Sequence, residues 1–314
     1  MIGEEHVPVL VEEVLDVLAP ISGGFYVDGT FGRGGHTERL LQAVGPTGRV
    51  LALDRDPVAV AAGRTRYAQD SRLQIVHADF ATLAAVVRDC GGERAVAGVL
   101  LDLGVSSPQL DVAERGFSFQ KDGPLDMRMD PTRGESAAEF VARADERELR
   151  TVIAELGEER FAGRIARAIV AARADEPITR TAQLAEIVRR AVRTHDGKHP
   201  ATRTFQALRM YVNDELGQLR AGLEAAFDVL APGGRLAVIS FHSLEDRMVK
   251  RFIRSKTSVD PVFAGLPVIP PSARPTMREV GRKRRASAAE IERNPRARSA
   301  VLRCAERCSP EASR

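Results

Sequence analysis

The stretch that decides the fold reads Gly24-Phe25-Tyr26-Val27-Asp28-Gly29-Thr30-Phe31-Gly32-Arg33-Gly34-Gly35-His36. Its first five residues form an apolar run that ends in an acid, which is typical of a short buried strand, and residues 35–44 have helical spacing. Glycines between a strand and a helix permit positive φ and let a ligand approach the backbone, while the helix start offers free N–H groups. An ordinary turn would contain the same glycines, so other parts of the sequence are needed to distinguish a turn from a ligand site.

Three further apolar runs follow at residues 49–54, 73–79 and 96–103, and helical patterns separate them. Repeated β-α-β units predict a parallel sheet with right-handed crossovers, and the carboxyl ends of its strands meet at one edge. At that edge the sequence places four acids, Asp28, Asp54, Asp79 and Asp102. A purely stabilising role predicts no such clustering, and α/β folds bind nucleotides at this edge. We therefore expect a nucleotide-type ligand.

The four acids also favour one kind of nucleotide. They would repel the pyrophosphate of NAD, which counts against a dehydrogenase, whereas they would attract the sulfonium and ammonium groups of S-adenosyl-L-methionine. On this interpretation Asp54 accepts hydrogen bonds from the ribose hydroxyls, and Phe80, directly after Asp79, lies beside the adenine. The other expected contacts are Gly34, Gly35 and His36 at the methionine end and Asp102 near the ammonium or the reacting methyl.

The β-α pattern stops after residue 104 and resumes about a hundred residues later. In between, no stretch has a convincing strand pattern, and helices are expected at residues 137–143, 147–156, 162–174 and 181–192, with Ser136 and Thr181 as caps. A long helix over residues 205–230, a strand over residues 235–241 and a final strand over residues 299–305 are expected after it. The sequence therefore predicts an α/β core of residues 1–104 and 205–314, with an inserted helical domain of residues 105–204 suited to substrate recognition.

The charges are unevenly distributed along the 314 residues. Lys and Arg total 46 and Asp and Glu total 43, so the net formal charge is only +3. Residues 274–307 contain eleven Lys or Arg against four Glu, and residues 1–273 carry a net charge of −4. The basic segment indicates a polyanionic partner, although a solvated tail has the same pattern. Arg makes up 41 of the 46 cations, and a biased genome composition would produce the same excess.

The composition excludes several classes of protein. Charged residues make up 28% and hydrophobic residues 44%, which is ordinary for a globular protein and unlike a disordered or collagen-like chain. Cys90, Cys304 and Cys308 are too few for a disulfide scaffold or a zinc site, so we expect free thiols, no metal and a cytoplasmic location. No apolar run of about 18 residues is present and the N-terminus lacks the features of a signal peptide, so we expect no membrane partner.

Five motifs occur in one order along the chain. They are His6-Val7-Pro8-Val9-Leu10, residues 28–37, Asp102-Leu103-Gly104-Val105-Ser106-Ser107-Pro108-Gln109, Ser240-Phe241-His242-Ser243-Leu244-Glu245-Asp246-Arg247 and Asn294-Pro295-Arg296-Ala297-Arg298-Ser299-Ala300. From His6 to about Arg303, the chain resembles the bacterial ribosomal RNA small subunit methyltransferase H family. The stretch from Gly281 to Ala289 departs from the family pattern because it is richer in Arg and Ala.

The resemblance implies a class I S-adenosyl-L-methionine-dependent methyltransferase fold, Rossmann-like with a mostly parallel sheet, and an inserted all-helical domain. It also implies transfer of a methyl group to N4 of cytosine 1402 in the decoding centre of 16S rRNA, in the small ribosomal subunit. The family's cofactor positions correspond here to Gly34, Gly35, His36, Asp54, Phe80, Asp102 and Gln109. The family match further suggests that His6 folds over the cofactor site, and it leaves a homodimer open.

The exocyclic amine of cytosine is a poor nucleophile because its lone pair is delocalised into the ring. A site can accept hydrogen bonds from the NH2 group and align the nitrogen with the methyl group and the sulfur. Many amino-methyltransferases place an acid or amide, two prolines and an aromatic residue after the fourth strand, and residues 102–109 stand there with one proline and no aromatic residue. The candidate catalytic residues are Asp102, Ser106 and Pro108, with Asp102 as a cofactor ligand first, although Asp102 could instead cap a turn.

Candidate RNA-binding residues lie in the last third of the chain. Phe241, with His242 beside it, could stack on a flipped cytosine, and equally Phe241 could belong to the core while His242 makes an ordinary hydrogen bond. Arg296 and Arg298 flank Ala297 in a stretch expected to be extended, so both would point to one face and, with residues 282–285, neutralise phosphates. The cations of the insert are expected mostly to form solvated helix faces; they include Arg189, Arg190, Arg193, Lys198 and Arg203.

Two other functions stay open on the sequence alone. The first is a methyltransferase that acts on DNA or on another RNA. The second is a ribosome-assembly factor that uses a methyltransferase-like fold only to bind, and the intact set of Gly34, Asp54 and Asp102 argues against it.

Overall fold

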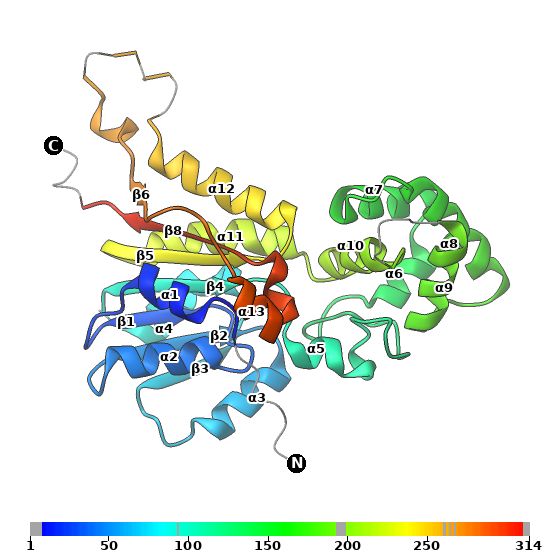
Figure 1. Ribbon diagram of the computed structural model, residues 1–314, viewed down its shortest axis with the longest axis horizontal. Coiled ribbons are helices and arrows are strands. Elements are labelled where there is room, and N and C mark those ends of the chain that lie inside the picture. The colour runs from blue at the N-terminus through cyan, green and yellow to red at the C-terminus, as the bar shows by residue number, and fades with distance from the viewer. Residues whose placement is uncertain are drawn as a thin grey trace. The chain divides into compact units, whose positions relative to one another are not determined.

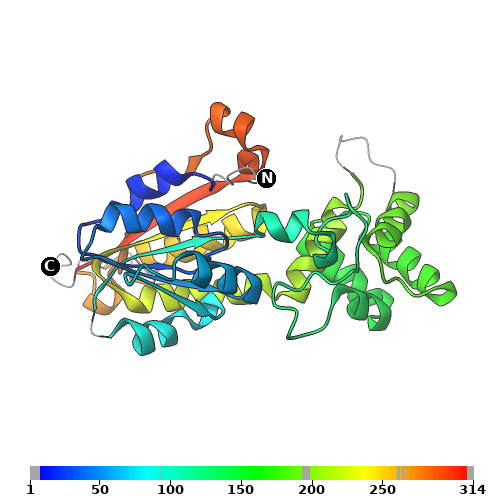
Figure 2. The same cartoon turned by 90° about the horizontal axis from the view of Figure 1, so that it is seen from below.

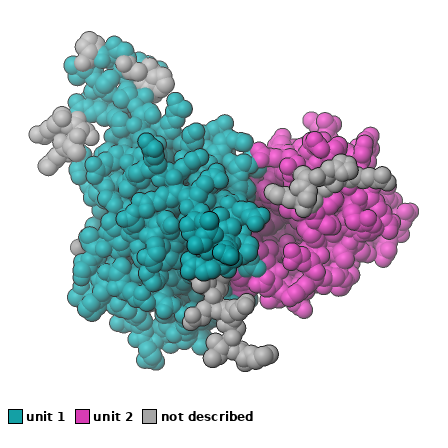
Figure 3. All heavy atoms as spheres, viewed as in Figure 1, with its two compact units in different colours: residues 1–104, 217–314 teal, residues 105–216 magenta. Residues whose placement is uncertain are grey.

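A computed structural model describes residues 8–92, 94–192, 199–259, 262–263, 265–266 and 268–309. The chain forms two compact units, coloured separately in Figure 3. The first unit comprises Met1–Gly104 and Gly217–Arg314, and the second comprises Val105–Leu216. The insert therefore extends to residue 216, and the boundary expected at residue 204 is wrong.

The first unit is built on an eight-stranded sheet with the order β3-β2-β1-β4-β5-β8-β6, and β7 also pairs with β8 (Figure 1). Strands β1 to β5 are parallel, and β8 runs antiparallel to β5, β6 and β7. The strands are β1 Phe25–Asp28, β2 Arg49–Asp54, β3 Leu73–His77, β4 Val96–Asp102, β5 Leu230–Ser240, β6 Met277–Glu279, β7 Arg284–Arg285 and β8 Val301–Arg307. The mostly parallel α/β sheet expected from the sequence is confirmed.

Helices cover both faces of this sheet (Figure 2). The helices of the first unit are α1 Val11–Leu18, α2 Gly35–Val44, α3 Pro57–Arg66, α4 Leu83–Gly91, α11 Glu215–Val229, α12 Ser243–Thr257 and α13 Ala288–Arg293, with α11 beginning just before the boundary of the unit. Buried side chains of α4, α11 and α12 share one core with the sheet, and those of α1 and α2 share another. All four residues of β1 are buried, because a central parallel strand has neighbours on both faces.

The carboxyl-terminal part of the first unit differs most from expectation. The strand expected at residues 299–305 is β8, displaced by two residues. Strands β6 and β7 were not expected, since three and two residues are too short to show an alternating pattern. Arg303 fixes β8 to α12 through a bidentate ion pair with Asp246, whose distances are 2.7 Å for Nε to Oδ1 and 3.1 Å for Nη2 to Oδ2.

The second unit is helical and has its own hydrophobic core. Its helices are α5 Ser107–Asp111, α6 Ala137–Arg143, α7 Glu146–Gly157, α8 Ala162–Asp175, α9 Thr181–Ala191 and α10 Thr202–Val212. Among the described residues of this unit there is no strand, only an isolated bridge between Pro124 and Arg180. The helix expected over residues 205–230 is instead two helices, α10 and α11, because the chain turns at Asn213 and at Asp214, whose φ is +45°. The side chains of α10 belong to the core of the insert, which moves the boundary beyond residue 204.

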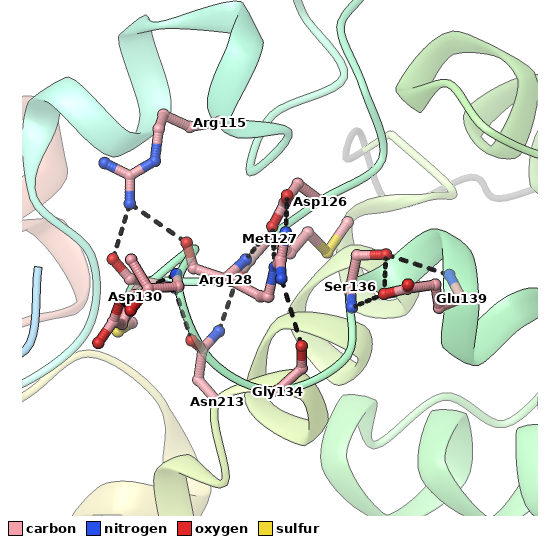
Figure 4. A network of polar contacts seen from close by, with 11 residues as sticks. Arg115, Asp126, Met127, Arg128, Asp130, Gly134, Ser136, Glu139 and Asn213 are labelled. Carbon is pink, nitrogen blue, oxygen red and sulfur yellow. Dashed lines mark hydrogen bonds and ion pairs between the residues drawn. The ribbon is translucent and has the colours of Figure 1, made fainter.

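One expected helix cap is confirmed and one is wrong. The Ser136 hydroxyl accepts the Glu139 N–H at 3.2 Å, and the Glu139 carboxylate accepts the Ser136 N–H at 2.7 Å, which closes a capping box before α6 (Figure 4). Thr181, expected to cap the helix over residues 181–192, is instead the first residue of that helix, α9, and Arg180 is the cap. The buried Thr181 hydroxyl accepts the Gly123 N–H at 3.0 Å and so holds the loop before α6.

Asn213 organises the loop that leads into α6 (Figure 4). Its Nδ2 donates to the carbonyl oxygens of Met127 at 2.7 Å and Arg209 at 2.8 Å, and its Oδ1 accepts the Met129 N–H at 2.8 Å. Met127 is buried with φ at +64°, in the left-handed region that side chains disfavour. The amide of Asn213 therefore compensates the strain of this loop, and the network is structural.

None of the helices in the described part of the chain combines the length and the apolar character that crossing a membrane requires.

Candidate cofactor site at the carboxyl edge of the sheet

The glycine loop joins β1 to α2 in the conformation that its sequence demands. Gly32 has φ at +54° and Gly34, the N-cap of α2, has φ at +77°, so both lie in the left-handed region. A Cβ on Gly34 would lie 2.9 Å from the Phe31 ring, and a Cβ on Gly35 would lie 2.7 Å from Pro8. Side chains at these positions would not fit, and the loop therefore presents bare backbone before α2.

Asp28 shapes this loop from inside. Its side chain is 1% exposed. Oδ1 accepts the Thr30 N–H at 3.1 Å, and Oδ2 accepts the Thr37 hydroxyl at 2.6 Å. Burial raises the pKa of Asp28, and these hydrogen bonds oppose the shift. The contacts of Asp28 thus serve the fold, since both of its oxygens already accept hydrogen bonds from the loop and from α2.

Asp102 ends β4 and keeps one oxygen without a partner. Its backbone N–H donates to the Thr30 hydroxyl at 2.7 Å, which links the tips of β1 and β4. Its Oδ2 lies 3.6 Å from His36 Nε2. Its Oδ1 is buried and accepts no hydrogen bond from any residue the structure describes. An acceptor in this state is costly to the fold alone, and a ligand cation or N–H group would satisfy it.

His36, on the first turn of α2, is held from two sides. It donates to the carbonyl of Val9, in the segment before α1, and it faces Asp102. Burial lowers the pKa of the His36 imidazole, but the nearby carboxylate of Asp102 outweighs burial and raises it overall. The segment that contains Pro8 and Val9 therefore packs on the cofactor loop. His6 lies outside the described residues.

Asp54 ends β2 and is bonded to the glycine loop. Its Oδ2 accepts the Gly32 N–H at 2.6 Å, and its Oδ1 accepts the Asp56 N–H at 2.8 Å. Burial raises the pKa of Asp54 to about 6, and these two hydrogen bonds oppose it. A carboxylate accepts about four hydrogen bonds, so two backbone donors leave capacity for the hydroxyls of a ribose.

The third strand tip holds an ion pair that the sequence did not indicate. Asp79 Oδ1 lies 3.0 Å from Arg55 Nε, so this acid is already neutralised. The only signal was the placement of Arg55 directly after Asp54. Phe80 follows at the start of a short 3-10 helix and is half-buried. A Cβ on Gly222 of α11 would lie 2.3 Å from its ring, so Gly222 makes room for Phe80.

Three predicted residues of the loop after β4 belong to the second unit. Ser106 is the N-cap of α5, and Pro108 lies in the first turn of that helix. Gln109 is buried, and its Oε1 accepts the Ser106 N–H at 2.9 Å. In the structure Gln109 therefore caps its own helix, while its predicted contact with the cofactor stays a prediction.

Phe241 and His242 have structural contacts of the kind the sequence left open. Phe241 is half-buried against the core shared by α1 and α2, and its ring would lie 3.5 Å from a Cβ on Gly104. His242 is the N-cap of α12, and its Nδ1 accepts the Glu245 N–H at 3.4 Å. The buried Glu245 carboxylate accepts the Phe241 N–H at 2.8 Å. Stacking of Phe241 on a base stays a prediction.

Arg296 and Arg298 do not lie in an extended stretch, as expected, but in the 3-10 helix Pro295–Ser299. Pro295 suits the first turn of a helix, and the Asn294 Oδ1 accepts the Arg296 N–H at 3.2 Å, so the sequence caps a helical turn. Both arginines are exposed and Ala297 between them is buried. Their common exposure follows from the helical turn rather than from strand alternation.

The cations named for the insert are mostly paired where the structure describes them. Arg189 and Arg190 both bond to Glu186, at 2.6 Å and 2.7 Å. Arg203 lies 3.9 Å from Glu159. Arg193 and Lys198 lie outside the described residues.

These features fit S-adenosyl-L-methionine. Among the described residues Asp102 Oδ1 has no hydrogen-bond partner, so it could accept a hydrogen bond from a positive or N–H-bearing group of the cofactor. Gly34 and Gly35 stand at the start of α2, where the first turn of the helix leaves backbone N–H groups without helical partners. Asp54 supplies acceptors for hydroxyl groups one strand away. Together these residues would hold the amino-acid end and the ribose of such a cofactor.

Comparison with known proteins agrees with this geometry. The model of the MraW methylase family matches residues 3–308. A relative from Thioalkalivibrio sulfidiphilus, named ribosomal RNA small subunit methyltransferase H, is 57% identical over 304 residues, covering 96% of this chain and 97% of the relative. A protein of the same name from Halorhodospira halophila is 55% identical over 306 residues, covering 97% and 94%. The chain therefore belongs to the MraW methylase family and is an S-adenosyl-L-methionine-dependent methyltransferase.

Proposed function

We propose that this methyltransferase modifies 16S rRNA in the small ribosomal subunit, at N4 of cytosine 1402 in the decoding centre. The names of relatives that are 55–57% identical over nearly their whole length support an rRNA substrate. The motif resemblance supports the cytosine and its N4 atom. The main structural support for the proposed chemistry is Asp102 Oδ1 at the tip of β4. This buried acceptor has no hydrogen-bond partner among the described residues.

The chain's own residues would bind and align the reactants. S-adenosyl-L-methionine supplies an electrophilic methyl group on a sulfonium. Asp54 accepts the ribose hydroxyls, and Phe80 lies beside the adenine. Asp102 Oδ1 accepts a hydrogen bond from the ammonium group or, at the reacting end, from the cytosine amine. His36 keeps Asp102 oriented, because its ring is fixed by the Val9 carbonyl.

Positioning supplies much of the rate in this scheme. The lone pair of the cytosine amine becomes available when its hydrogens bond to acceptors and the nitrogen becomes pyramidal. We assign this role to Asp102 together with Ser106 and Pro108, the candidates of the loop after β4. Holding nitrogen, methyl and sulfur in line converts a bimolecular displacement into an effectively unimolecular one.

The remaining partners follow from this substrate. We propose that the second unit recognises the RNA and that exposed Arg296 and Arg298 contact its phosphates. The free thiols of Cys90, Cys304 and Cys308 suit a reducing compartment, which supports the cytoplasm as the location.

Nucleoside mass spectrometry of 16S rRNA tests the proposal. We expect N4-methylated cytosine at position 1402 when the wild-type protein is present in a strain that lacks the native gene, and none without it. The Asp102→Ala variant should lose cofactor affinity in calorimetry and lose the modification. Asp89→Ala, at an exposed position of α4, removes the same charge and should behave as the wild type.

Each alternative has its own outcome in these experiments. Methylation of DNA or of another RNA, with 16S rRNA unmodified, would replace the substrate. A wild-type protein that binds no S-adenosyl-L-methionine would favour an assembly factor. An Asp102→Ala variant with unchanged affinity and turnover would remove Asp102 from the mechanism.

A further inference from the structure

Five arginines that form no ion pair with a described residue lie on two helices of the second unit and on the turn between them. They are Arg147, Arg150, Arg160, Arg164 and Arg167, and all five are exposed. Within the described ranges, no carboxylate lies within ion-pair distance of any of them. The fold therefore leaves five positive charges on α7, on α8 and on the turn between them.

The five side chains form one continuous face. Arg147 and Arg150 are three residues apart on α7, and Arg164 and Arg167 are three apart on α8, so each pair shares a helix face. The two helices share one core. The stem of Arg150 crosses from α7 to α8, since its Cδ lies 3.7 Å from the place of a Cβ on Gly163. A glycine at that position lets the Arg150 stem lie against α8.

An aromatic ring lies within this face. The guanidinium carbons of Arg160 and Arg164 lie 4.6 Å and 5.8 Å from the ring centroid of Phe161, the half-buried N-cap of α8. The two cations are therefore at most about 10 Å apart. Cations interleaved with an aromatic ring are typical of surfaces that bind single-stranded nucleic acid, because the ring stacks on a base while the cations contact phosphates.

Other arginines of the same unit are compensated by the fold. Arg189 and Arg190 bond to Glu186 at 2.6 Å and 2.7 Å, and Arg180 bonds to Asp122 at 2.6 Å. A biased genome composition explains the number of arginines in the chain. It does not explain why, among the described arginines of the second unit, those without ion pairs lie mainly on α7, on α8 and on the turn between them.

We propose that this arginine face binds the phosphate backbone of single-stranded rRNA, and this inference rests on the proposed function. The chemistry favours RNA over a lipid surface, because a membrane-binding helix needs large apolar side chains beside its cations. The exposed large apolar residues in the described part of the chain all lie elsewhere, at Ile21, Val58, Val112, Val262, Leu266 and Val268.

The test compares two double variants of the full-length protein. Arg164→Ala/Arg167→Ala removes two charges from the arginine face, and Arg189→Ala/Arg190→Ala removes two charges that are paired on α9. The affinity for a fluorescein-labelled RNA strand copied from the decoding centre is measured by anisotropy between about 50 and 200 mM KCl. Each phosphate contact to a single strand contributes about 0.7 to the slope of log affinity against log salt. We therefore expect the slope to fall by about 1.4 in the first variant and to stay unchanged in the second.

Retention of charge provides a further check. Arg164→Lys/Arg167→Lys keeps both cations and should keep the wild-type slope. An unchanged slope in the alanine variant, or an equal loss in the α9 variant, overturns the inference. The inference is also overturned if the alanine variant loses binding to phosphatidylglycerol vesicles but keeps its binding to RNA.

Failure of the proposed function would look different. A wild-type protein that leaves 16S rRNA unmodified, together with an alanine variant that shows the expected fall in slope, refutes the substrate and supports the arginine face. A wild-type protein that methylates 16S rRNA, with an alanine variant that binds RNA normally, refutes the arginine face alone.

Discussion

Asp28 and Asp102 stand at the tips of neighbouring strands, and the fold uses them differently. Asp28 receives hydrogen bonds from Thr30 and Thr37 on its two oxygens. Asp102 receives none on Oδ1 from the residues that the structure describes, although that atom is buried. Leaving a buried acceptor unpaired costs roughly 1–3 kcal/mol, so the fold keeps Asp102 Oδ1 in a state that a ligand would relieve.

The pKa of Asp54 predicts a pH dependence of cofactor binding. Burial raises this pKa to about 6 in the free protein, and ribose hydroxyls bond best to the ionised carboxylate. Affinity should therefore be constant above about pH 7 and fall below pH 6, by up to about tenfold per pH unit. Calorimetry with S-adenosyl-L-methionine between pH 5 and pH 8 measures it.

The Asp54→Asn variant is the control for this titration. The asparagine side chain cannot ionise. The variant should therefore bind the cofactor more weakly, and its affinity should not change between pH 5 and pH 7 as that of the wild type does. His36 also has a raised pKa and stays in place in the variant. A step of the same size in Asp54→Asn would therefore assign the titration to His36 or Asp28, whose pKa values are both raised.

Thr30 is predicted to position Asp102. Its hydroxyl accepts the Asp102 N–H at 2.7 Å and lies 3.4 Å from Asp28 Oδ1, to which it donates. Thr30→Val keeps the shape of the side chain but leaves that N–H unpaired, so cofactor affinity should fall by about 5- to 150-fold, as a cost of about 1–3 kcal/mol implies. Calorimetry measures the affinity.

Two control variants accompany Thr30→Val. Thr30→Ser keeps the hydroxyl and should restore affinity. Thr65→Val removes an exposed hydroxyl that bonds the Ala61 carbonyl within α3, and it should leave affinity unchanged. Wild-type affinity in Thr30→Val would show that Asp102 needs no support from this hydroxyl.

Sequence reasoning found the acids of the site but not their partners. Asp54, Asp79 and Asp102 follow apolar runs, and the period of a strand fixes where a run ends. The pairing of Asp79 with Arg55 depends on the register of β2 against β3, which places Asp54 opposite His77. No local pattern encodes that register, so the neutralisation of one acid was not predictable.

A hydrogen bond connects two segments that are far apart in the sequence, the segment before α1 and the helix α13. The buried Leu10, whose φ is +56°, donates its N–H to the Glu290 carboxylate at 2.7 Å. Glu290→Ala removes this acceptor, and we expect the free energy of unfolding to fall by about 1–3 kcal/mol. Urea unfolding followed by circular dichroism measures the loss.

The same helix supplies a matched control. Glu292→Ala removes an exposed carboxylate of α13 and should leave stability within about 0.5 kcal/mol of the wild type. Glu290→Gln keeps an acceptor oxygen and should recover part of the loss. Equal effects of Glu290→Ala and Glu292→Ala would show that the contact with Leu10 contributes nothing.

Elements with a clear period or a recognisable helix cap were predictable, and very short strands and turns were not. The helix over residues 137–143 was placed at its observed bounds, because Ser136 and Glu139 form a recognisable capping box. Strands β6 and β7 exist only because β8 offers them a partner. The turn around Arg296 depends on a cap by Asn294, and the sequence alone suggested an extended segment.

The whole molecule consists of two units with separate cores, which predicts that the insert folds alone. All buried members of the insert's core lie between Leu125 and Leu208. A fragment of residues 105–216 should therefore be helical and unfold cooperatively on heating, as measured by circular dichroism. A fragment with no cooperative transition would contradict this independence.

A pair of substitutions makes the fragment test specific. Ile153→Ala removes a buried side chain of α7 and should lower the stability of the fragment by about 2–5 kcal/mol. Thr151→Ala lies at an exposed position of the same helix and should change it little. Equal effects would indicate a loosely packed fragment rather than a domain.

Domain organisation was predictable on one side of the insert only. The last strand before the insert ends in Asp102, and the boundary at residue 104 follows from it. On the other side helical sequence runs from the insert into the core without a Gly-Pro break. Asn213 and Asp214 interrupt it, and their role depends on contacts with the distant loop at Met127 and Met129.

The separation of β4 from its partner β5 has a consequence for biosynthesis. β4 ends at Asp102 and β5 begins at Leu230, so the ribosome adds 127 residues between the two strands. At typical elongation rates this takes roughly 6 to 25 s. During that time β4 is an unpaired edge of a half-made sheet, which makes the nascent chain prone to aggregation. Early folding of the insert would shorten this exposed loop before the second half of the sheet arrives.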